Sequence, residues 1–354
     1  MTVTWVPSWP LIATKNLELR RRRGLIVVVA LLTVGPTVLV LGLRLIFHAV
    51  DPASYGPAGS PGIFQALANL MAEFGFLSAA ALGASAGTTD LSEGMFRHLV
   101  ITGRSRLALY LARIPAGLAI LLPLVAVAFT ALCLVTSYAG VPQPTSVSMD
   151  GITVPQHFDQ AELQSWLLQH PQQAASAVPL GPGPTPGAAQ IRSAIDQNIA
   201  GLYGDYVSNE VGGSNPAANE MAKIGLWLEL EVGIGFTVGL GLGSLTGQRT
   251  LTTITLIGLE IIVTPILANH VIPYFLDGQR LIVGLAMDQL RPAALAPGGA
   301  GPGGGPGGPG RVLFGGRGAL GIPPMPTWAM ISVIVGWIVG WSVIGAWRMI
   351  TRDA

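Results

Sequence analysis

Six long apolar segments dominate this sequence and limit the fold that it can adopt. They lie at 24–47, 63–86, 107–137, 222–246, 251–271 and 327–348. Each is close to or above the roughly 20 residues that a helix needs to cross a hydrocarbon core of about 30 Å. Only 10% of the 354 residues are charged, against about a quarter in soluble domains. The sequence therefore predicts an all-α polytopic membrane protein with six transmembrane helices.

Residues 1–23 precede the first apolar segment and predict an interfacial helix. Trp9 and its apolar neighbours would lie in the headgroup layer, with Lys15 and Arg20–Arg23 facing anionic lipid. The alternative is a frayed polar tail. The apolar run that follows is about twice the length of a signal-peptide core, so we expect it to be retained as the first span.

The distribution of lysine and arginine predicts the orientation in the membrane. If the N-terminus is cytoplasmic, 11 of the 19 basic residues fall in short cytoplasmic segments. The opposite loop, 139–220, carries seven acidic residues and one basic residue, Arg192. We therefore expect a multi-pass protein of the cell membrane with both termini in the cytoplasm: spans one to three over 24–137, spans four and five over 222–271, and span six within 327–354.

Two extracytoplasmic loops are unusually long. Residues 138–221 place helix-like pieces near 159–169 and 188–203 between proline-rich linkers, which predicts a partly ordered cap. Residues 272–326 begin with an amphipathic stretch at 279–290 that is too short to span, so it is expected to be re-entrant or interfacial. The glycine- and proline-rich run after it is typical of a flexible linker.

The segment 87–113 is the densest charged interruption between two apolar segments. Asp90 followed by Glu93 has the spacing of a capping box at a helix start. Apolar residues then recur at helical spacing: Leu91, Met95, Phe96 and Leu99. We expect a short amphipathic helix over 90–101 that presents its apolar side, together with Arg97, to a cytoplasmic partner.

Glycines recur every four residues near the end of the fourth apolar segment, at Gly235, Gly239, Gly243 and Gly247. This spacing removes side chains from one helix face and allows a second helix to approach closely. The partner helix could belong to the same chain or to a second subunit. The segment is not a phosphate loop, because no G-x-x-x-x-G-K-[ST] motif occurs and Gln248 follows Gly247. We therefore expect no ATP binding by this chain.

Carboxylates occur in or near three of the apolar segments: Glu73, Glu229, Glu231 and Glu260. A charge in hydrocarbon costs a few kcal/mol or more, so each should face the bundle interior or be protonated. They could line a substrate or proton path. They could equally form interior hydrogen bonds or, for Glu229 and Glu231, lie at the water boundary.

No catalytic or metal-binding set is apparent in the sequence. The five histidines are scattered, and the single cysteine, Cys133, lies inside an apolar run. No nucleophile elbow and no H-E-x-x-H motif occurs. These observations argue against a disulfide framework, a thiolate metal site and a membrane enzyme.

Three features resemble the permease subunit of ABC type-2 exporters. They are the basic lead-in LIATKNLELRRRRGLIVVVALL, the segment ALGASAGTTDLSEGMFRHLVITGRSRLALYLARIPAG, and the six-span plan with both termini inside. The resemblance covers the spans but not the 139–220 cap or the glycine/proline linker. It implies that Asp90–Ile101 is a coupling helix and Trp9–Arg23 a connecting helix, and that 279–290 matches a re-entrant helix.

The resemblance also implies partners. Such permeases pair with a second permease subunit and with separate nucleotide-binding subunits, which bind ATP and magnesium; this chain would then need no cofactor and contact no nucleic acid. Two other functions remain open. One is a proton-coupled secondary transporter that uses Glu73 or Glu260, although no internal repeat is seen. The other is a non-transporting membrane scaffold whose 139–220 region binds an outside partner.

Overall fold

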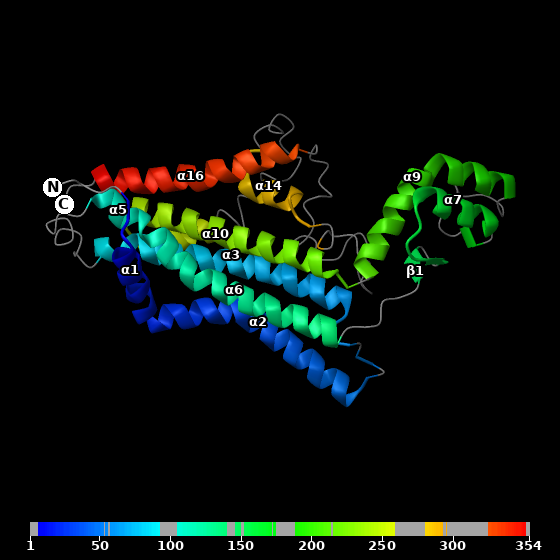
Figure 1. Cartoon of the computed structure of the whole chain (residues 1–354), viewed down its shortest axis with the longest axis horizontal. Helices are drawn as coiled ribbons and strands as arrows, with labels where there is room; N and C mark the ends of the chain where they lie inside the picture. Colours follow the sequence, from blue (N-terminus) through cyan, green and yellow to red (C-terminus); the bar gives the residue numbers. More distant parts are fainter. Residues whose placement is uncertain are drawn as a thin grey trace.

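The protein is a bundle of long helices with a small separate unit beyond one end (Figure 1). The computed structural model describes residues 6–52, 54–55, 57–92, 105–139, 146–149, 152–171, 173–174, 188–213, 215–258, 280–292, 295 and 325–351. Helix α1 and the C-terminal end of α16 lie at one end of the bundle, which we call the termini end. The small unit lies beyond the opposite end, which we call the cap end.

Five helical segments are long and apolar enough to cross a membrane. They are α2 (Arg23–Val50), α3 (Pro61–Ser92), the nearly continuous pair α5 (Arg106–Leu111) and α6 (Arg113–Tyr138), α10 (Ala218–Thr246) and α16 (Thr327–Thr351). They confirm five of the six predicted spans and make the chain a helical membrane protein. For the remaining prediction, 251–271, α11 (Arg249–Gly258) covers the first part, and 259–271 lies outside the described residues.

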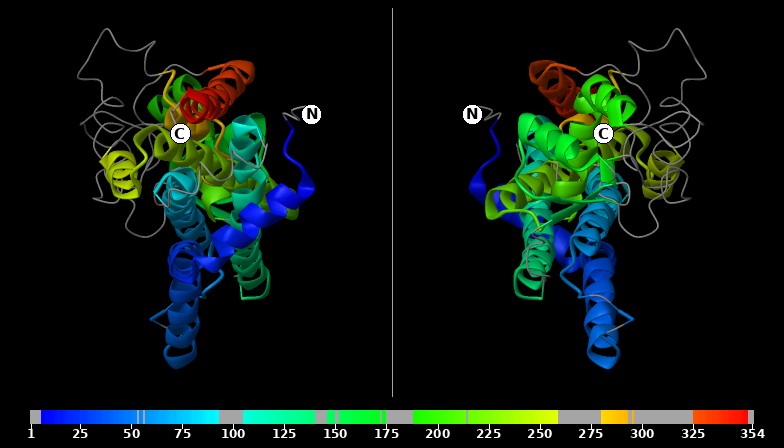
Figure 2. Two further views of the ribbon diagram at one scale, coloured as in Figure 1. Left: turned by 90° about the vertical axis from the view of Figure 1, so that its left-hand side faces the viewer. Right: turned by 90° about the vertical axis from the view of Figure 1, so that its right-hand side faces the viewer.

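Helix α1 (Trp9–Arg21) runs across the bundle instead of along it (Figure 2). Its inward side is buried at Leu11, Lys15 and Leu19, which recur every four residues. Trp9, on the other side, is 77% exposed. The helix predicted within residues 1–23 is therefore present, and it has one buried side and one open side, as an interfacial helix requires.

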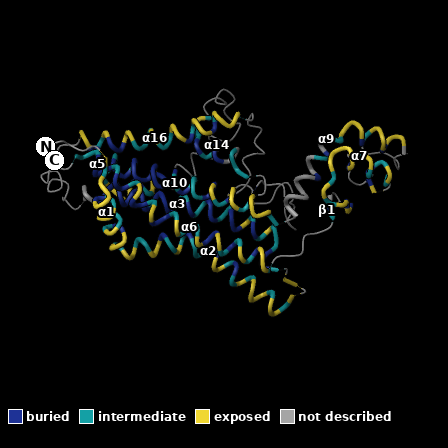
Figure 3. The backbone as a smooth tube through the Cα atoms, in the orientation of Figure 1, coloured by how far each residue is buried: buried dark blue, intermediate teal, exposed yellow. Residues whose placement is uncertain are grey.

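Helix α10 lies at the centre of the bundle, packed against α3, α6 and α16. Burial is concentrated on α3 and α10, whereas the outward sides of α2 and α16 are open (Figure 3). The open sides are apolar and include Val27, Leu31, Val38, Val335, Val339 and Trp347. Exposed apolar helix faces suit a hydrocarbon solvent, which fits a membrane location for the bundle.

The cap-end unit has a hydrophobic core of its own. Strands β1 (Ser146–Met149) and β2 (Ile152–Pro155) form an antiparallel hairpin, and α7 (Gln160–Gln169) and α9 (Ala188–Gly213) pack with it. A capping box of Asp159 and Glu162 starts α7. The core includes Val154, Leu163, Leu167, Ile195 and Tyr206. The two predicted helical pieces are confirmed, and the loop adds a short hairpin that the sequence analysis does not predict.

Tyr206 joins the two halves of this unit, because its hydroxyl donates to the Pro155 carbonyl at 2.8 Å and accepts from the Phe158 amide at 3.1 Å. Replacing it with phenylalanine removes both bonds and should cost about 1–3 kcal/mol. We expect Tyr206→Phe to speed limited proteolysis within 146–213. Tyr203→Phe removes the hydroxyl from the adjacent stacked ring and should change the rate of proteolysis less. Equal proteolysis rates for the two variants would contradict the role given to the Tyr206 hydroxyl.

Candidate coupling site

The first three residues of the predicted coupling helix belong to α3. Helix α3 continues through Asp90 and Leu91 to Ser92, so Asp90 does not start a new helix and the predicted capping box is wrong. The last turns of α3 contain side-chain hydrogen bonds within the helix. The Thr88 hydroxyl donates to the Ala84 carbonyl at 3.0 Å, and the Thr89 hydroxyl donates to the Ser85 carbonyl at 2.6 Å. The remaining predicted contact residues lie outside the described residues: Glu93, Met95, Phe96 and Arg97.

Both helices that flank this segment are anchored at the termini end. Arg113 of α6 is 2% exposed, and its Nη1 donates to the Gly87 carbonyl of α3 at 3.4 Å. Ser105 caps α5, since its Oγ accepts from the Ala108 amide at 3.1 Å. Residues 93–104, which lie outside the described residues, therefore connect two helices that contact each other.

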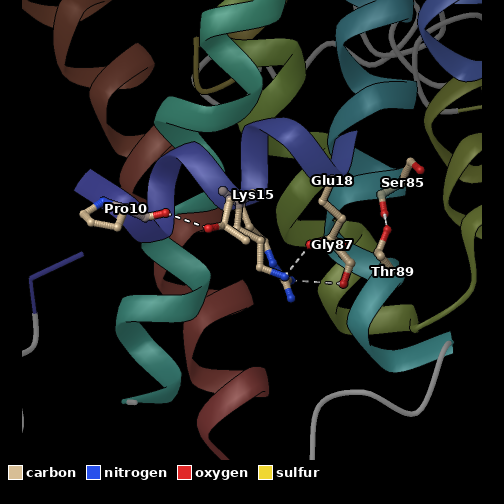
Figure 4. A network of polar contacts seen from close by, with 8 residues as sticks. Pro10, Lys15, Glu18, Ser85, Gly87 and Thr89 are labelled. Carbon is tan, nitrogen blue, oxygen red and sulfur yellow. Dashed lines mark hydrogen bonds and ion pairs between the residues drawn. The ribbon is translucent and has the colours of Figure 1, made fainter. Parts of the chain in front are cut away.

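Helix α1 lies across the same place. The Asn16 Nδ2 donates to the Ala116 carbonyl of α6 at 2.8 Å, and Leu11 packs with residues 108–112. Lys15 is 6% exposed and pairs with Glu18 at 2.8 Å. Figure 4 shows Lys15 and Glu18 directed toward the end of α3 that carries Gly87 and Thr89. We call Lys15, Asn16, Glu18, Gly87 and Arg113 the termini-end cluster.

The C-terminal helix also reaches this end of the bundle. Arg106, at the start of α5, donates from Nη1 to the Ile350 carbonyl of α16 at 2.9 Å. The Tyr110 ring packs directly against Gly345 of α16. These contacts join four segments that are distant in sequence: α1, α3, α5–α6 and α16. They lie at the end of the bundle where α3 ends and α5 begins.

The glycine repeat of α10 packs within this chain, which decides between the two sequence interpretations. A Cβ atom at Gly235 would lie 2.7 Å from the Phe76 carbonyl, and one at Gly243 would lie 2.6 Å from the Ala84 carbonyl. A Cβ at Gly239 would overlap the Ala80 carbonyl. The contact is reciprocal: Gly83 and Gly87 of α3 lie against the α10 backbone at 236–244. We call this backbone contact of α3 with α10 the glycine seam.

Gly247 does not belong to the glycine seam. It follows α10 with φ of 68°, and its amide donates to the Gly243 carbonyl at 2.9 Å. A left-handed residue that closes the last helical turn is a common end for a helix, and glycine adopts it without strain. The four-residue spacing therefore combines three packing glycines with one capping glycine.

The membrane carboxylates divide by position. Glu73 on α3 and Glu231 on α10 are partly buried, and both take part in polar or electrostatic interactions. Gly75 lies against Val232 with a Cβ distance of 3.0 Å, which places this part of α3 level with this part of α10. Glu229, also partly buried, is on another side of α10, because two residues turn a helix by about 200°. Glu260 lies outside the described residues.

Sequence reasoning missed several buried polar residues. Arg113 stands inside the predicted span 107–137, and an arginine in an otherwise apolar run is a usable signal for an interior role. Lys15 is expected from the sequence to face lipid headgroups, but its side chain is buried and pairs with Glu18. Asn69, Trp227 and Arg291 meet at the cap-side half of the bundle, and nothing in their spacing along the chain indicates this.

No protein-family model and no curated protein sequence matches this chain.

Proposed function

We propose that this chain is the membrane-spanning permease subunit of an ATP-driven exporter of the ABC type-2 kind. In this proposal a separate nucleotide-binding subunit hydrolyses ATP and the permease moves a substrate outward. The same proposal includes a second permease subunit, ATP and magnesium bound only by the nucleotide-binding partner, and a cell-membrane location with the termini end in the cytoplasm.

The observation that carries the proposal is the anchoring of both ends of residues 93–104. A push on that segment would reach α3 through Ser92 and α6 through the Ser105 cap. The termini-end cluster ties α1, α3 and α6 together, so the displacement would not dissipate within a loose loop. The glycine seam then passes the motion of α3 to α10, because two backbones in contact move as one body.

The residues proposed to contact the nucleotide-binding subunit are those of the sequence prediction: Asp90, Leu91, Glu93, Met95, Phe96 and Arg97. Met95 and Phe96 supply the apolar contact in this arrangement. Glu93 and Arg97 stand four residues apart and would stabilise a helical segment by about 0.3–0.5 kcal/mol.

Replacing Met95 and Phe96 together with aspartate tests the proposal. The variant should insert and purify like the wild type, because both changes fall in the sequence between α3 and α5 and not among the residues of the described core. It should lose its nucleotide-binding subunit, since two buried carboxylates would replace the apolar contact. Co-purification of an ATPase from detergent-solubilised membranes, measured by mass spectrometry and by ATP hydrolysis, gives the result.

The matched control is the double change Met95→Leu and Phe96→Leu, which keeps an apolar side and should retain the ATPase. If the aspartate variant retains an ATPase at the wild-type yield, the coupling assignment is wrong. If the wild-type chain itself purifies without any ATPase, the whole proposal fails.

A membrane scaffold for an outside partner is the second candidate, and the folded cap-end unit favours it. This unit has ten buried core residues of its own and is not needed to complete the bundle core. A scaffold would lose its partner when residues 146–213 are replaced with a short glycine/serine linker. It would keep that partner in the Met95→Asp and Phe96→Asp variant, which is the reverse of the pattern for a permease.

A further inference from the structure

An arginine occupies a polar site between α3 and α10 in the cap-side half of the bundle. The Arg291 Nη2 donates to Oδ1 of Asn69 on α3 at 2.7 Å. Its guanidinium carbon lies 5.5 Å from the centre of the Trp227 ring on α10. Trp227 itself is only 6% exposed and belongs to the main core. Arg291 therefore places a cation against an aromatic face and an amide oxygen among the spans.

The site lies beside the main core and not at the tip of either helix. Asn69 and Trp227 lie about 12–14 Å along their helices from the starts at Pro61 and Ala218, at about 1.5 Å per residue. A charged side chain that is held between apolar helices is expensive and generally marks a functional position.

Two carboxylates stand one turn deeper on the same two helices. Glu73 is four residues beyond Asn69, and Glu231 is four residues beyond Trp227, so both lie on the same helix faces about 6 Å further in. Both are partly buried, and both are engaged in interactions in the present arrangement. The site thus combines an indole face, an amide oxygen and two carboxylates.

Such a set of groups recognises cations that carry apolar substituents. An indole face attracts a cation through its quadrupole, most strongly when water is excluded. A carboxylate adds charge attraction, and helix α14 (Val283–Gln289), which shares the main core with Trp227 and accepts its Nε1 bond at Met287, adds an apolar wall. A hydrated metal ion would gain no binding energy from an apolar wall, and Glu73 and Glu231 would repel an anion.

We infer that the groups around Asn69, Glu73, Trp227 and Glu231 form a recognition site for lipophilic organic cations, and that Arg291 is a tethered cation that fills it when no ligand is bound. An incoming guanidinium, ammonium or phosphonium compound takes the place of the Arg291 guanidinium on Trp227 and Asn69. Binding of such a cation involves this chain alone. Only the further step, that the bound cation is a transported substrate, rests on the proposed export function.

The attachment of α14 makes this exchange possible without unfolding the site. The Trp337 Nε1 of α16 donates to the Leu281 carbonyl at 2.8 Å, and the Trp227 Nε1 donates to the Met287 carbonyl at 3.0 Å. The chain just before α14 and the last turn of α14 are therefore each held by a hydrogen bond from a tryptophan side chain, and neither bond involves Arg291. Arg291 follows α14 outside the helix, so its side chain can leave the ring while α14 stays in place.

Binding of tetraphenylphosphonium to the purified chain in detergent tests the inference. Tetraphenylborate, an anion of the same size and shape, is the matched control ligand. Each affinity is measured by equilibrium dialysis, with the signal of Trp227→Leu subtracted as background. The wild type should bind the cation more tightly than the anion. Arg291→Gln removes the competing tethered cation and should tighten cation binding at least tenfold, without tightening anion binding.

Arg249→Gln, an exposed arginine at the opposite end, should leave both affinities unchanged. If Arg291→Gln does not purify as a single species, Arg291→Met is measured in its place, because methionine keeps a contact with the Trp227 ring. A wild type that prefers the anion, or a neutral residue at 291 that leaves cation binding unchanged, overturns the inference. Neither result depends on an ATPase partner, so a failure here is distinct from a failure of the coupling test.

Discussion

Gly239→Ala is expected to lower the thermal stability of the protein more than any other single methyl group added to α10. A Cβ at this position would overlap the Ala80 carbonyl of α3, and both partners are helix backbone that cannot rotate away. Separating α3 from α10 would open contacts along the whole glycine seam, which should cost about 3 kcal/mol or more. Thermal unfolding of the purified protein in detergent, followed by size-exclusion chromatography, measures the change.

The matched control lies six residues earlier on the same helix. Gly233 has nothing within 4 Å of its Cβ position, so Gly233→Ala adds the same methyl group without a clash. Alanine is favoured over glycine within a helix by roughly 1 kcal/mol, so this variant should be as stable as the wild type or slightly more stable. Equal losses for the two variants would show that the two backbones are not in contact.

Arg113→Leu should produce the second large loss of stability. Arg113 is among the largest fully buried side chains of the described residues, and it joins α6 to the Gly87 carbonyl of α3. Removing it leaves that carbonyl without its cation and disturbs the termini-end cluster around Lys15 and Glu18. Hydrogen bonds from charged groups are worth about 1.5–3 kcal/mol, so a melting temperature lower by several degrees is expected.

Arg106→Leu is the control for this change, because it removes the same type of side chain from the same segment. Its bond to the Ile350 carbonyl is exposed to solvent, where such contacts contribute about 1 kcal/mol or less. The two variants should therefore separate clearly in melting temperature. An Arg113→Leu variant as stable as Arg106→Leu would contradict the anchoring role of the termini-end cluster.

Hydropathy and charge patterning were sufficient to predict the spans. Each of α2, α3, α5–α6, α10 and α16 begins and ends within about six residues of its predicted bounds, because lipid requires long uninterrupted apolar helices. The hairpin of β1 and β2 was missed although the sequence carries a signal for it: Asp150 and Gly151, a pair favoured in two-residue hairpin turns, stand between the paired residues Met149 and Ile152. Each strand has only four residues, so the flanking alternation is short. Short strands in a polar loop are stabilised by the helices that cover them.

The candidate sites were less accessible to sequence reasoning, for a physical reason. The glycine spacing predicted a close helix contact, but only the structure identifies α3 as the partner of α10. Arg291 and Asn69 are 222 residues apart, and no local pattern can report a pair at such a separation. The start of the coupling segment was misplaced because a capping box is a local signal, and α3 extends through it.

The glycine seam also restricts where anything could move through this protein. From Gly75 to Gly87, α3 lies against α10 with no side chains between the two backbones at the closest positions, which leaves no room for water, an acyl chain or a cargo molecule. Under the proposed function, a compound that reaches Trp227 from the termini end would have to go around this pair of helices, along α2, α6 or α16. The compound would then reach Trp227 from the side of the bundle, on the cap-end side of the glycine seam.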